Sequence, residues 1–319
     1  MKNIPKLYIM IGIPGAGKST LAKEIAKDNA AVIVSSDSIR KELFDDENNQ
    51  DNNEQVFNEF HKRIKSNLKN GVSVIADATN LSLKSRRAIL QNVLKIECEK
   101  NAVVISRDIY EAISANNLRS RVVPEHDIFK HRSRFQIPFY EEGFDNIFIV
   151  QVGNNKTVSD LENLIEKTCN YDQKNHHHAD TLDQHCLKVT HTFLSMGYSQ
   201  IAEAAGVLHD IGKLYTQQFD EDGEAHYLCH ENVGAYTIIC YKDAVCKKYN
   251  LTDDEFLDVV FLANYHMRPY QWTTDAAIQK NQKQFGNKFD MLMDFHKCDS
   301  ELSHEFKKNN DCMEEYLEY

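Results

Sequence analysis

Residues 12–20, with the sequence GIPGAGKST, constrain the fold of this chain more than any other segment. The apolar run 7–13 leads into the loop, and residues 19–26 have the pattern of a helix. A glycine-rich loop between a buried strand and a helix N-terminus directs backbone N–H groups at phosphates. This context predicts a P-loop for a nucleoside triphosphate, with Lys18 at the β- and γ-phosphates and Ser19 on Mg²⁺; the alternative is a glycine-rich turn without a ligand. The residues expected at the nucleotide are Gly12, Gly15, Ala16, Gly17, Lys18, Ser19 and Thr20.

The remaining apolar segments predict two kinds of architecture. Four further β-rich runs alternate with helical patterns, at residues 31–35, 72–76, 102–105 and 147–152. Such alternation is typical of a parallel sheet flanked by helices. After residue 170 apolar side chains recur almost only at helical spacing. We therefore expect an α/β P-loop domain over residues 1–170 and an all-α domain over residues 171–319.

The boundary between these domains is predicted near residue 170. Residues 159–168 have the pattern of an amphipathic helix that opens with a Ser159/Glu162 capping box. Residues 170–180 are polar and rich in Asn and His, which is typical of a linker. A chain of 319 residues is long enough for two domains, each with its own core.

The two predicted domains differ in charge. Residues 1–170 hold 24 Lys and Arg against 23 Asp and Glu, whereas residues 171–319 hold 13 against 25. An acidic domain repels phosphate backbones unless bound cations offset its charge. A polyanion is therefore expected to be held by the first half of the chain or at a metal site.

Composition also bears on the cellular compartment. No apolar stretch approaches the length of a membrane span, and the segment before Lys6 is short and polar, so no secretory signal is expected. The eight cysteines have no Cys-x-x-Cys spacing, which favours reduced thiols over a zinc ribbon or a redox motif. We expect a soluble, cytoplasmic protein without a membrane partner.

Polar side chains follow the second and third predicted strands. Asp37 comes directly after the run 31–35, and Arg40 lies three residues later. Beside a γ-phosphate, a carboxylate can accept the proton of an acceptor hydroxyl, and an arginine can bind an acceptor phosphate; a helix cap is the alternative for Asp37. Asp77 stands where a Walker-B carboxylate would. Two roles stay open for it, contact with Mg²⁺ through water or orientation of Arg40.

A basic segment follows the fourth predicted strand. Five basic side chains stand against Glu125 and Asp127, namely Arg119, Arg121, Lys130, Arg132 and Arg134. A basic helical flap stabilises charge on a transferring phosphoryl group. We expect Arg119 and Arg121 to act in such a lid, and a solvated helix face is the alternative.

These elements, in their order along the chain, resemble the kinase module of phage and bacterial polynucleotide kinases of the end-healing type. The resemblance covers residues 1–152 and rests on the P-loop, the Asp37/Arg40 pair, Asp77-x-Thr79-Asn80, the Arg-rich VVPE segment 119–125, and residues 142–145. It implies that Asp37 is the general base toward a 5′-hydroxyl and that Arg40 binds the acceptor phosphate. Arg119 or Arg121 would then contact the donor.

A second set of residues has the chemistry of a metal site. It comprises His185, the pair His209-Asp210, which we expect on the apolar helix that includes residues 204–208, and Asp299. Imidazole and carboxylate ligands suit Mn²⁺, Ni²⁺, Fe²⁺, Co²⁺ or Mg²⁺. The set resembles the signature of the HD phosphohydrolase superfamily over roughly residues 176–306. The resemblance implies a helical bundle in which these four residues hold a first metal ion.

Three further residues extend this set. His230 and His266 fall where dinuclear members of that superfamily place ligands for a second ion, which would clamp both oxygens of an in-line displacement. Structural histidines are the alternative at both positions. Lys213, one turn beyond Asp210, is expected at the scissile phosphate, unless it is an ordinary solvated lysine.

Taken together, the resemblances imply a bifunctional nucleic-acid end-healing enzyme whose substrate is RNA. The first domain would be an ATP-dependent 5′-hydroxyl kinase, and the second a metal-dependent 3′-phosphatase or 2′,3′-cyclic phosphodiesterase. A ligase is the implied partner, since both ends of broken RNA commonly need repair before ligation. Two alternatives remain: a small-molecule or nucleoside kinase joined to an HD nucleotidase, which the net acidity favours, and an NTP-dependent regulator, against which Asp37 argues.

Overall fold

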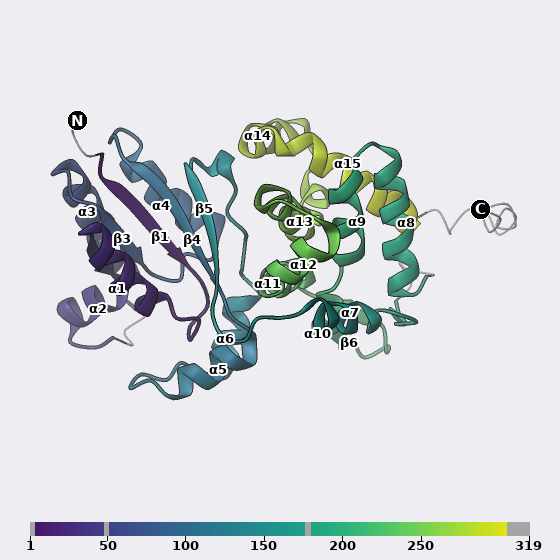
Figure 1. Cartoon of the computed structure of the whole chain (residues 1–319), viewed down its shortest axis with the longest axis horizontal. Helices are drawn as coiled ribbons and strands as arrows, with labels where there is room; N and C mark the ends of the chain where they lie inside the picture. The colour runs from purple at the N-terminus through teal and green to yellow at the C-terminus, as the bar shows by residue number, and fades with distance from the viewer. Residues whose placement is uncertain (1–3, 48–50, 176–179, 305–319) are drawn as a thin grey trace, which may run out of the picture. The chain divides into compact units, whose positions relative to one another are not determined.

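The computed structural model describes residues 4–47, 51–175 and 180–304. The chain divides into two compact units, Met1–Asn155 and Lys156–Tyr319. In the first unit strands alternate with helices (Figure 1). Its elements are β1 (Lys6–Ile11), α1 (Lys18–Asn29), β2 (Val32–Ser35), α2 (Ser36–Phe44), α3 (Asn53–Lys69), β3 (Val74–Asp77), α4 (Leu83–Val93), β4 (Glu99–Ser106), α5 (Ile109–Asn117), α6 (Glu125–Arg132), the 3₁₀ helix η1 (Tyr140–Glu142) and β5 (Asn146–Gln151).

Five parallel strands form the sheet of this unit, in the order β2-β3-β1-β4-β5. β1 lies at the centre and pairs Ile9 with Ala76 of β3 and with Ala102 of β4. Leu7 and Ile9 have no exposed surface. Because the central strand of a parallel sheet is covered on both faces, its sequence is a continuous apolar run. Each of the five predicted strands is present, and the predicted parallel sheet with flanking helices is confirmed.

The parallel arrangement brings the carboxyl ends of the strands to one edge of the sheet, where ligands of such sheets bind. The loop 12–20 follows β1, and Asp37 lies in the first turn of the helix after β2. Asp77 is the last residue of β3, and Arg107 follows β4. The topology therefore gathers these polar side chains around the P-loop.

A buried ion pair ties together two segments of the first unit. Arg86 on α4 donates from Nε and Nη2 to the two carboxylate oxygens of Glu142 at 2.8 and 2.6 Å. Its Nη1 also donates to the carbonyl oxygens of Leu81 and Gln136 at 3.1 and 2.8 Å. Burial raises the pKa of Glu142, and the Arg86 guanidinium opposes that shift. One guanidinium thus satisfies backbone groups after β3 and after α6.

Replacing Arg86 by Ala is expected to destabilise the first unit by about 3–5 kcal/mol, because Glu142 would be left as a buried, unpaired charge. Hydrogen exchange of peptides from the first unit, followed in denaturant, measures this loss separately from the second unit. Arg87→Ala on the same helix is the control, with an expected change within about 0.5 kcal/mol. Equal effects of the two variants would contradict the role given to Arg86.

The second unit is largely helical (Figure 1). Its elements are α7 (Val158–Glu166), α8 (Leu182–Ser195), α9 (Ser199–Leu208), α10 (Lys213–Thr216), β6 (Gln217–Phe219), β7 (Ala225–Tyr227), α11 (His230–Cys240), α12 (Lys242–Tyr249), α13 (Asp253–Tyr265), the 3₁₀ helix η2 (Pro269–Gln271), α14 (Asp275–Phe285) and α15 (Lys288–His304). The prediction of an all-α domain is wrong at β6 and β7, which pair as an antiparallel hairpin. Strands of three residues are too short for alternation of apolar and polar side chains to reveal them.

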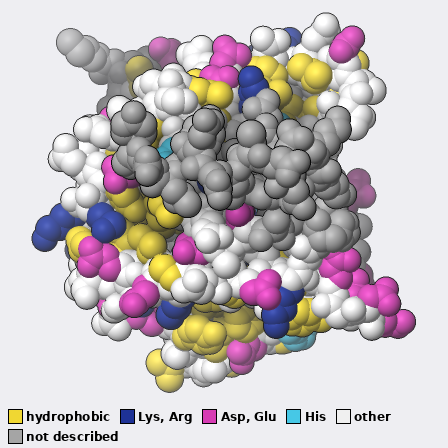
Figure 2. Space-filling view, turned by 90° about the vertical axis from the view of Figure 1, so that its right-hand side faces the viewer, with side chains coloured by type: hydrophobic (Ala, Val, Ile, Leu, Met, Phe, Trp, Pro, Cys, Tyr) yellow, Lys and Arg dark blue, Asp and Glu magenta, His cyan; other side chains and the backbone are white. Residues whose placement is uncertain are grey.

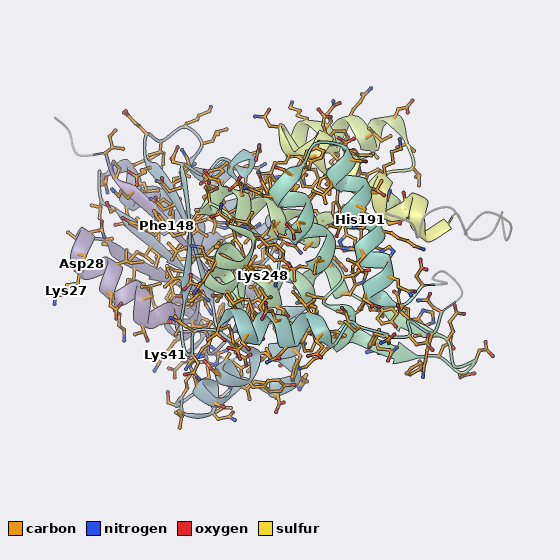
Figure 3. The ribbon with its side chains drawn as sticks, turned by 45° about the vertical axis from the view of Figure 1, so that its right-hand side comes forward. Lys27, Asp28, Lys41, Phe148, His191 and Lys248 are labelled. Carbon is orange, nitrogen blue, oxygen red and sulfur yellow. The ribbon has the colours of Figure 1, made fainter. Side chains whose placement is uncertain are left out.

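Helix α7 belongs to the second unit, so the division lies earlier than the predicted boundary near residue 170. α7 packs against α12, where Lys248, labelled in Figure 3, donates to Glu162 at 3.0 Å. Thr157 caps α7 and forms a capping box with Asp160. That box lies two residues before the predicted one, which is therefore wrong.

Among the described residues, no helix is both long and apolar enough to cross a membrane. Figure 2 looks onto the side of the second unit that carries α8 and α15. Acidic side chains are scattered over this face among fewer basic ones. The view agrees with the excess of acidic residues after residue 170.

Candidate functional site

The loop 12–20 has the backbone conformation that a phosphate site needs. Gly15 has a φ of 79°, and a Cβ there would lie 2.1 Å from the carbonyl oxygen of Ala112. Gly17, with a φ of 104°, caps α1, which begins at Lys18. Only glycine adopts such a conformation readily at so close an approach. The N–H groups in the first turn of α1 therefore form an anion site at the helix N-terminus.

The predicted nucleotide-binding residues divide into two groups. Those that line the cavity beside the loop are Gly15, Gly17, Lys18, Ser19 and Thr20. Gly12 and Ala16 do not line it: the Gly12 N–H donates to the carbonyl oxygen of Thr79 at 3.1 Å, and Ala16 is fully buried. These two residues hold the loop against the sheet edge.

Lys18, Ser19 and Asp77 lie together beside the loop. Ser19 Oγ donates to Asp77 Oδ2 at 3.0 Å, and Lys18 Nζ donates to the carbonyl oxygen of Ile13 at 2.8 Å. Burial lowers the pKa of Lys18 to about 8, against the opposing effect of Asp77. Burial raises the pKa of Asp77, and Lys18 and Ser19 oppose that shift. The Ser19 hydroxyl and the Asp77 carboxylate are oxygen ligands of the kind that Mg²⁺ prefers.

Nucleotide affinity is expected to fall as the pH rises above about 8, by up to about tenfold per pH unit. The free site loses the Lys18 proton near that pH, whereas bound phosphates favour the charged ammonium, so binding above pH 8 takes up a proton. Titration of ATP binding from about pH 7 to about pH 9 measures the effect. A Lys18→Arg variant keeps its charge throughout and should give a flat profile. An equally flat profile for the wild type would contradict the prediction.

Asp37 lies between two arginines. Its Oδ1 accepts from Arg40 Nη1 at 2.8 Å, and its Oδ2 lies 3.1 Å from Arg121 Nη1. Arg40 Nη2 also donates to Asn53 Oδ1 at 2.9 Å. The cap of α2 is Ser35, whose hydroxyl accepts from the backbone N–H of the third helical residue. Asp37 is therefore not the helix cap, and its half-exposed carboxylate faces the cavity.

The predicted basic flap is only partly helical. Arg119 and Arg121 lie in the irregular segment between α5 and α6, because Pro124 caps α6 and the residue before a proline disfavours helix. Arg119 lies close enough to Lys18 to help lower its pKa, whereas Arg121 pairs with Asp37. Arg132 is buried over the ring of Phe129 instead of facing the cavity.

The cavity has a volume of about 840 Å³ and is lined mostly by polar and basic side chains. Phe57, Arg107 and His131 are among the lining residues that were not predicted from the sequence. Arg107 Nη1 donates to the carbonyl oxygen of Gly15 at 3.1 Å and so supports the P-loop. Its position directly after β4, at the ligand-binding edge of the sheet, is the signal that could have identified it.

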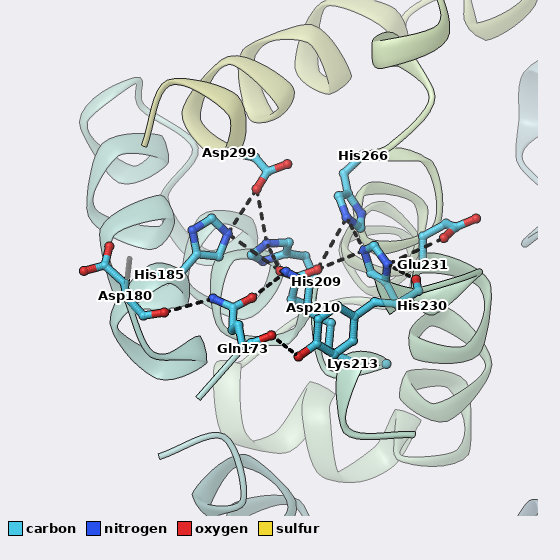
Figure 4. A network of polar contacts seen from close by, with 12 residues as sticks. Gln173, Asp180, His185, His209, Asp210, Lys213, His230, Glu231, His266 and Asp299 are labelled. Carbon is cyan, nitrogen blue, oxygen red and sulfur yellow. Dashed lines mark hydrogen bonds and ion pairs between the residues drawn. The ribbon is translucent and has the colours of Figure 1, made fainter. Parts of the chain in front are cut away.

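In the second unit, the predicted metal ligands come together from separate elements (Figure 4). His209 and Asp210 lie in the turn that follows α9, which ends at Leu208, so the prediction that they lie on that helix is wrong. The others lie on helices or at their ends: His185 on α8, His230 at the start of α11, His266 at the end of α13 and Asp299 on α15. All six side chains are buried.

Asp210 links two groups of ligand atoms. Its Oδ2 lies 3.7 Å from His185 Nε2 and 3.4 Å from His209 Nε2, while Asp299 Oδ1 lies 3.1 and 3.7 Å from the same two nitrogens. On its other side, Asp210 Oδ1 lies 3.1 Å from His230 Nε2 and 3.6 Å from His266 Nε2. Both groups have the size of a metal site and could each hold an ion, with Asp210 as the bridging carboxylate.

Backbone carbonyl groups fix the orientation of three of these histidines. Nδ1 of His209, His230 and His266 lies 2.9, 2.8 and 2.9 Å from the carbonyl oxygen three residues earlier. A carbonyl oxygen only accepts, so Nδ1 carries a proton and Nε2 is the ring nitrogen that faces the cluster. The Nε2 atoms of His230 and His266 are 3.2 Å apart. Two ring nitrogens at this distance need a proton or a metal ion between them, and the orientation of the rings fits a metal ion.

Electrostatics give the same result. Burial lowers the pKa of His209, but the carboxylates of Asp210 and Asp299 outweigh burial and raise it to about 10. Burial raises the pKa of both carboxyl groups, but Lys213 and His209 outweigh burial at Asp210, and His185 and His209 outweigh it at Asp299, so the pKa of each carboxyl group lies well below the usual range. The cluster thus demands positive charge, which a divalent ion supplies more fully than a proton.

Gly212 and Lys213 complete the turn. A Cβ at Gly212 would lie 2.0 Å from the carbonyl oxygen of His230, so glycine lets the turn approach α11 and brings Asp210 to His230. Lys213 is buried, and its Nζ lies 2.7 Å from Asp210 Oδ2 and donates to Gln173 Oε1 at 2.8 Å. It is therefore not an ordinary solvated lysine.

Comparison with known proteins bears on the first unit. Residues 7–138 match a protein family described as AAA domain. The first unit contains a kinase-like P-loop domain. A kinase-like domain of this kind implies ATP with Mg²⁺ and favours a phosphotransferase.

Solved structures with similarity to the chain include chains of an RNA repair complex and a gluconokinase. One is a chain in a structure of the Pnkp1/Rnl/Hen1 RNA repair complex, with 28% identity over 42% of this chain and 45% of that chain and a TM-score of 0.38. A chain in a second structure of the Pnkp1/Rnl/Hen1 complex has 29% identity, coverage of 39% and 42%, and a TM-score of 0.33. A gluconokinase from Sinorhizobium meliloti 1021 has 14% identity, coverage of 48% and 85%, and a TM-score of 0.36. The chain spans less than half the length of the RNA-repair chains that it matches.

Proposed function

We propose that this chain is a bifunctional end-healing enzyme that acts on RNA. The first unit would transfer the γ-phosphoryl group of ATP to a 5′-hydroxyl, and the second would remove a 3′-phosphate or a 2′,3′-cyclic phosphate. The observation that carries the kinase assignment is Asp37, held by Arg40 beside the P-loop in a basic cavity. The RNA assignment rests on the motif order along residues 1–152.

In the kinase reaction, the acceptor oxygen bonds to the γ-phosphorus while the bond to the β,γ-bridging oxygen breaks. Asp37 would take the proton of the acceptor hydroxyl, and Arg40 would bind the adjacent phosphate. Arg121 contacts Asp37 Oδ2, so its movement onto the transferring phosphoryl group would free that oxygen for the proton. Arg119 and Lys18 would stabilise charge on the donor side.

In the second unit, His185, His209, Asp210 and Asp299 would hold one divalent ion, and His230 and His266 would hold a second one through the shared Asp210. When bound, such an ion supplies Lewis-acid activation of a phosphate ester. The buried Lys213 adds positive charge beside these ligands, where it would bind the phosphate of the substrate.

The kinase assignment is tested with labelled ATP and parallel acceptors: a 5′-hydroxyl oligoribonucleotide, the matching oligodeoxyribonucleotide, a set of nucleosides, and gluconate. Efficient transfer to the oligoribonucleotide is the expected result. Transfer to nucleosides or gluconate, without transfer to either oligomer, would replace the end-healing function with a small-molecule kinase.

A further inference from the structure

Gln173 is buried beside the metal-ligand cluster, although its segment was predicted to be a linker. Its side chain is 1% exposed. Its Oε1 accepts from Lys213 Nζ at 2.8 Å, and its Nε2 donates to the carbonyl oxygen of Asp180 at 3.2 Å (Figure 4). Its own carbonyl oxygen accepts from the hydroxyl of Tyr227 at 2.7 Å. Both ends of the side-chain amide, and the backbone carbonyl group, therefore form hydrogen bonds.

The segment around Gln173 is fixed from both sides. The Leu182 N–H, at the start of α8, donates to the carbonyl oxygen of Tyr171 at 3.0 Å. The Ala225 N–H, in β7, donates to the carbonyl oxygen of Lys174 at 2.9 Å. These bonds fix the position of Gln173 relative to α8 and β7. They thereby hold its amide oxygen within hydrogen-bond distance of Lys213 Nζ.

Lys213 and the candidate metal site compete for one oxygen atom. Asp210 Oδ2 lies 2.7 Å from the Lys213 ammonium and also faces Nε2 of His185 and His209. A divalent ion on these ligands would repel an ammonium group at such a distance. The ammonium therefore needs another acceptor if Asp210 is to bind the ion fully.

We propose that Gln173 is a positioning residue that draws the Lys213 ammonium away from Asp210 Oδ2 when a divalent ion binds, and holds it next to the phosphate site. This inference rests on the proposed metal-dependent hydrolase. An amide oxygen suits the task because it accepts a hydrogen bond without adding charge to the cluster. A nonpolar side chain at position 173 would offer the Lys213 ammonium no acceptor, so the ammonium would stay on Asp210 Oδ2.

Mn²⁺ affinity, measured by calorimetry on the full chain, tests the inference. Gln173→Leu should weaken Mn²⁺ binding by about 10- to 100-fold, the usual effect of losing a residue that supports metal ligands. The same substitution in a Lys213→Met background should have no effect, because the competing ammonium is gone. Asp210→Asn serves as the blank for Mn²⁺ that binds elsewhere in the chain.

The outcomes separate this inference from the proposed function. Wild-type protein that binds no more Mn²⁺ than Asp210→Asn would overturn the metal site itself. Normal Mn²⁺ affinity in Gln173→Leu, or an equal loss with and without Lys213, would overturn only the role of Gln173. Gln173→Glu keeps an acceptor for the ammonium, so Mn²⁺ affinity near that of the wild type is expected. Loss in this variant equal to that of Gln173→Leu would also contradict the inference.

Discussion

Replacing Asp37 with Asn is expected to lower the rate of phosphoryl transfer by about 10²- to 10⁴-fold, the range typical of losing a general base. The amide keeps the shape of the side chain but cannot take the proton of the acceptor hydroxyl. The hydrolase of the second unit should keep its rate, because its candidate ligands all lie beyond residue 180. Initial rates with labelled ATP and a 5′-hydroxyl oligoribonucleotide measure the first effect.

The matched control is Asp127→Asn, which removes a carboxylate from the lining of the same cavity. Its rate should stay within a few-fold of the wild type. Asp37 also holds Arg40 and Arg121, so the variant could act through those residues. A rise in KM for the acceptor with an unchanged kcat would indicate that Asp37 only positions the arginines, and would contradict its role as base.

The sheet and the P-loop could be predicted because their signals are local. A parallel strand that is buried on both faces must be a short apolar run, and β1, β3 and the second part of β4 are buried in this way. The loop 12–20 carries its own conformational requirement in Gly15 and Gly17. Asp37 and Asp77 could be selected because parallel strands bring their carboxyl ends to one edge.

The residues that were missed act through partners far away in the sequence. Gln173 contacts Lys213, 40 residues later, and nothing in its neighbourhood distinguishes it from a polar linker residue. His230 and His266, 36 residues apart, were not missed, but they could be selected only through the resemblance to dinuclear members of the HD superfamily. The irregular lid segment did have a local signal, Pro124, which prevents one helix from running through Arg119 and Arg121.

Replacing Asp210 with Asn is expected to remove most metal-dependent phosphatase activity, by about a thousandfold, since a metal ion is worth several kcal/mol to such a transition state. Asp210 is the carboxylate that both groups of ligands share. Asparagine keeps the size of the side chain but brings no charge. His185 and His209 would lose the carboxylate oxygen on one side, and His230 and His266 would lose the oxygen on the other.

Release of phosphate from a 3′-phosphorylated oligoribonucleotide measures this loss, with and without chelator and added Mn²⁺. Asp243→Asn, an exposed aspartate on α12 of the same unit, is the control and should keep the activity. Fluorescence of Trp272, the one tryptophan of the chain, reports whether the second unit is folded in each variant. A phosphatase that survives both Asp210→Asn and the chelator would mean that the cluster is structural. If Asp210→Asn loses only the phosphatase and Asp37→Asn only the kinase, each activity is assigned to its own unit, because each variant keeps the reaction that the other has lost.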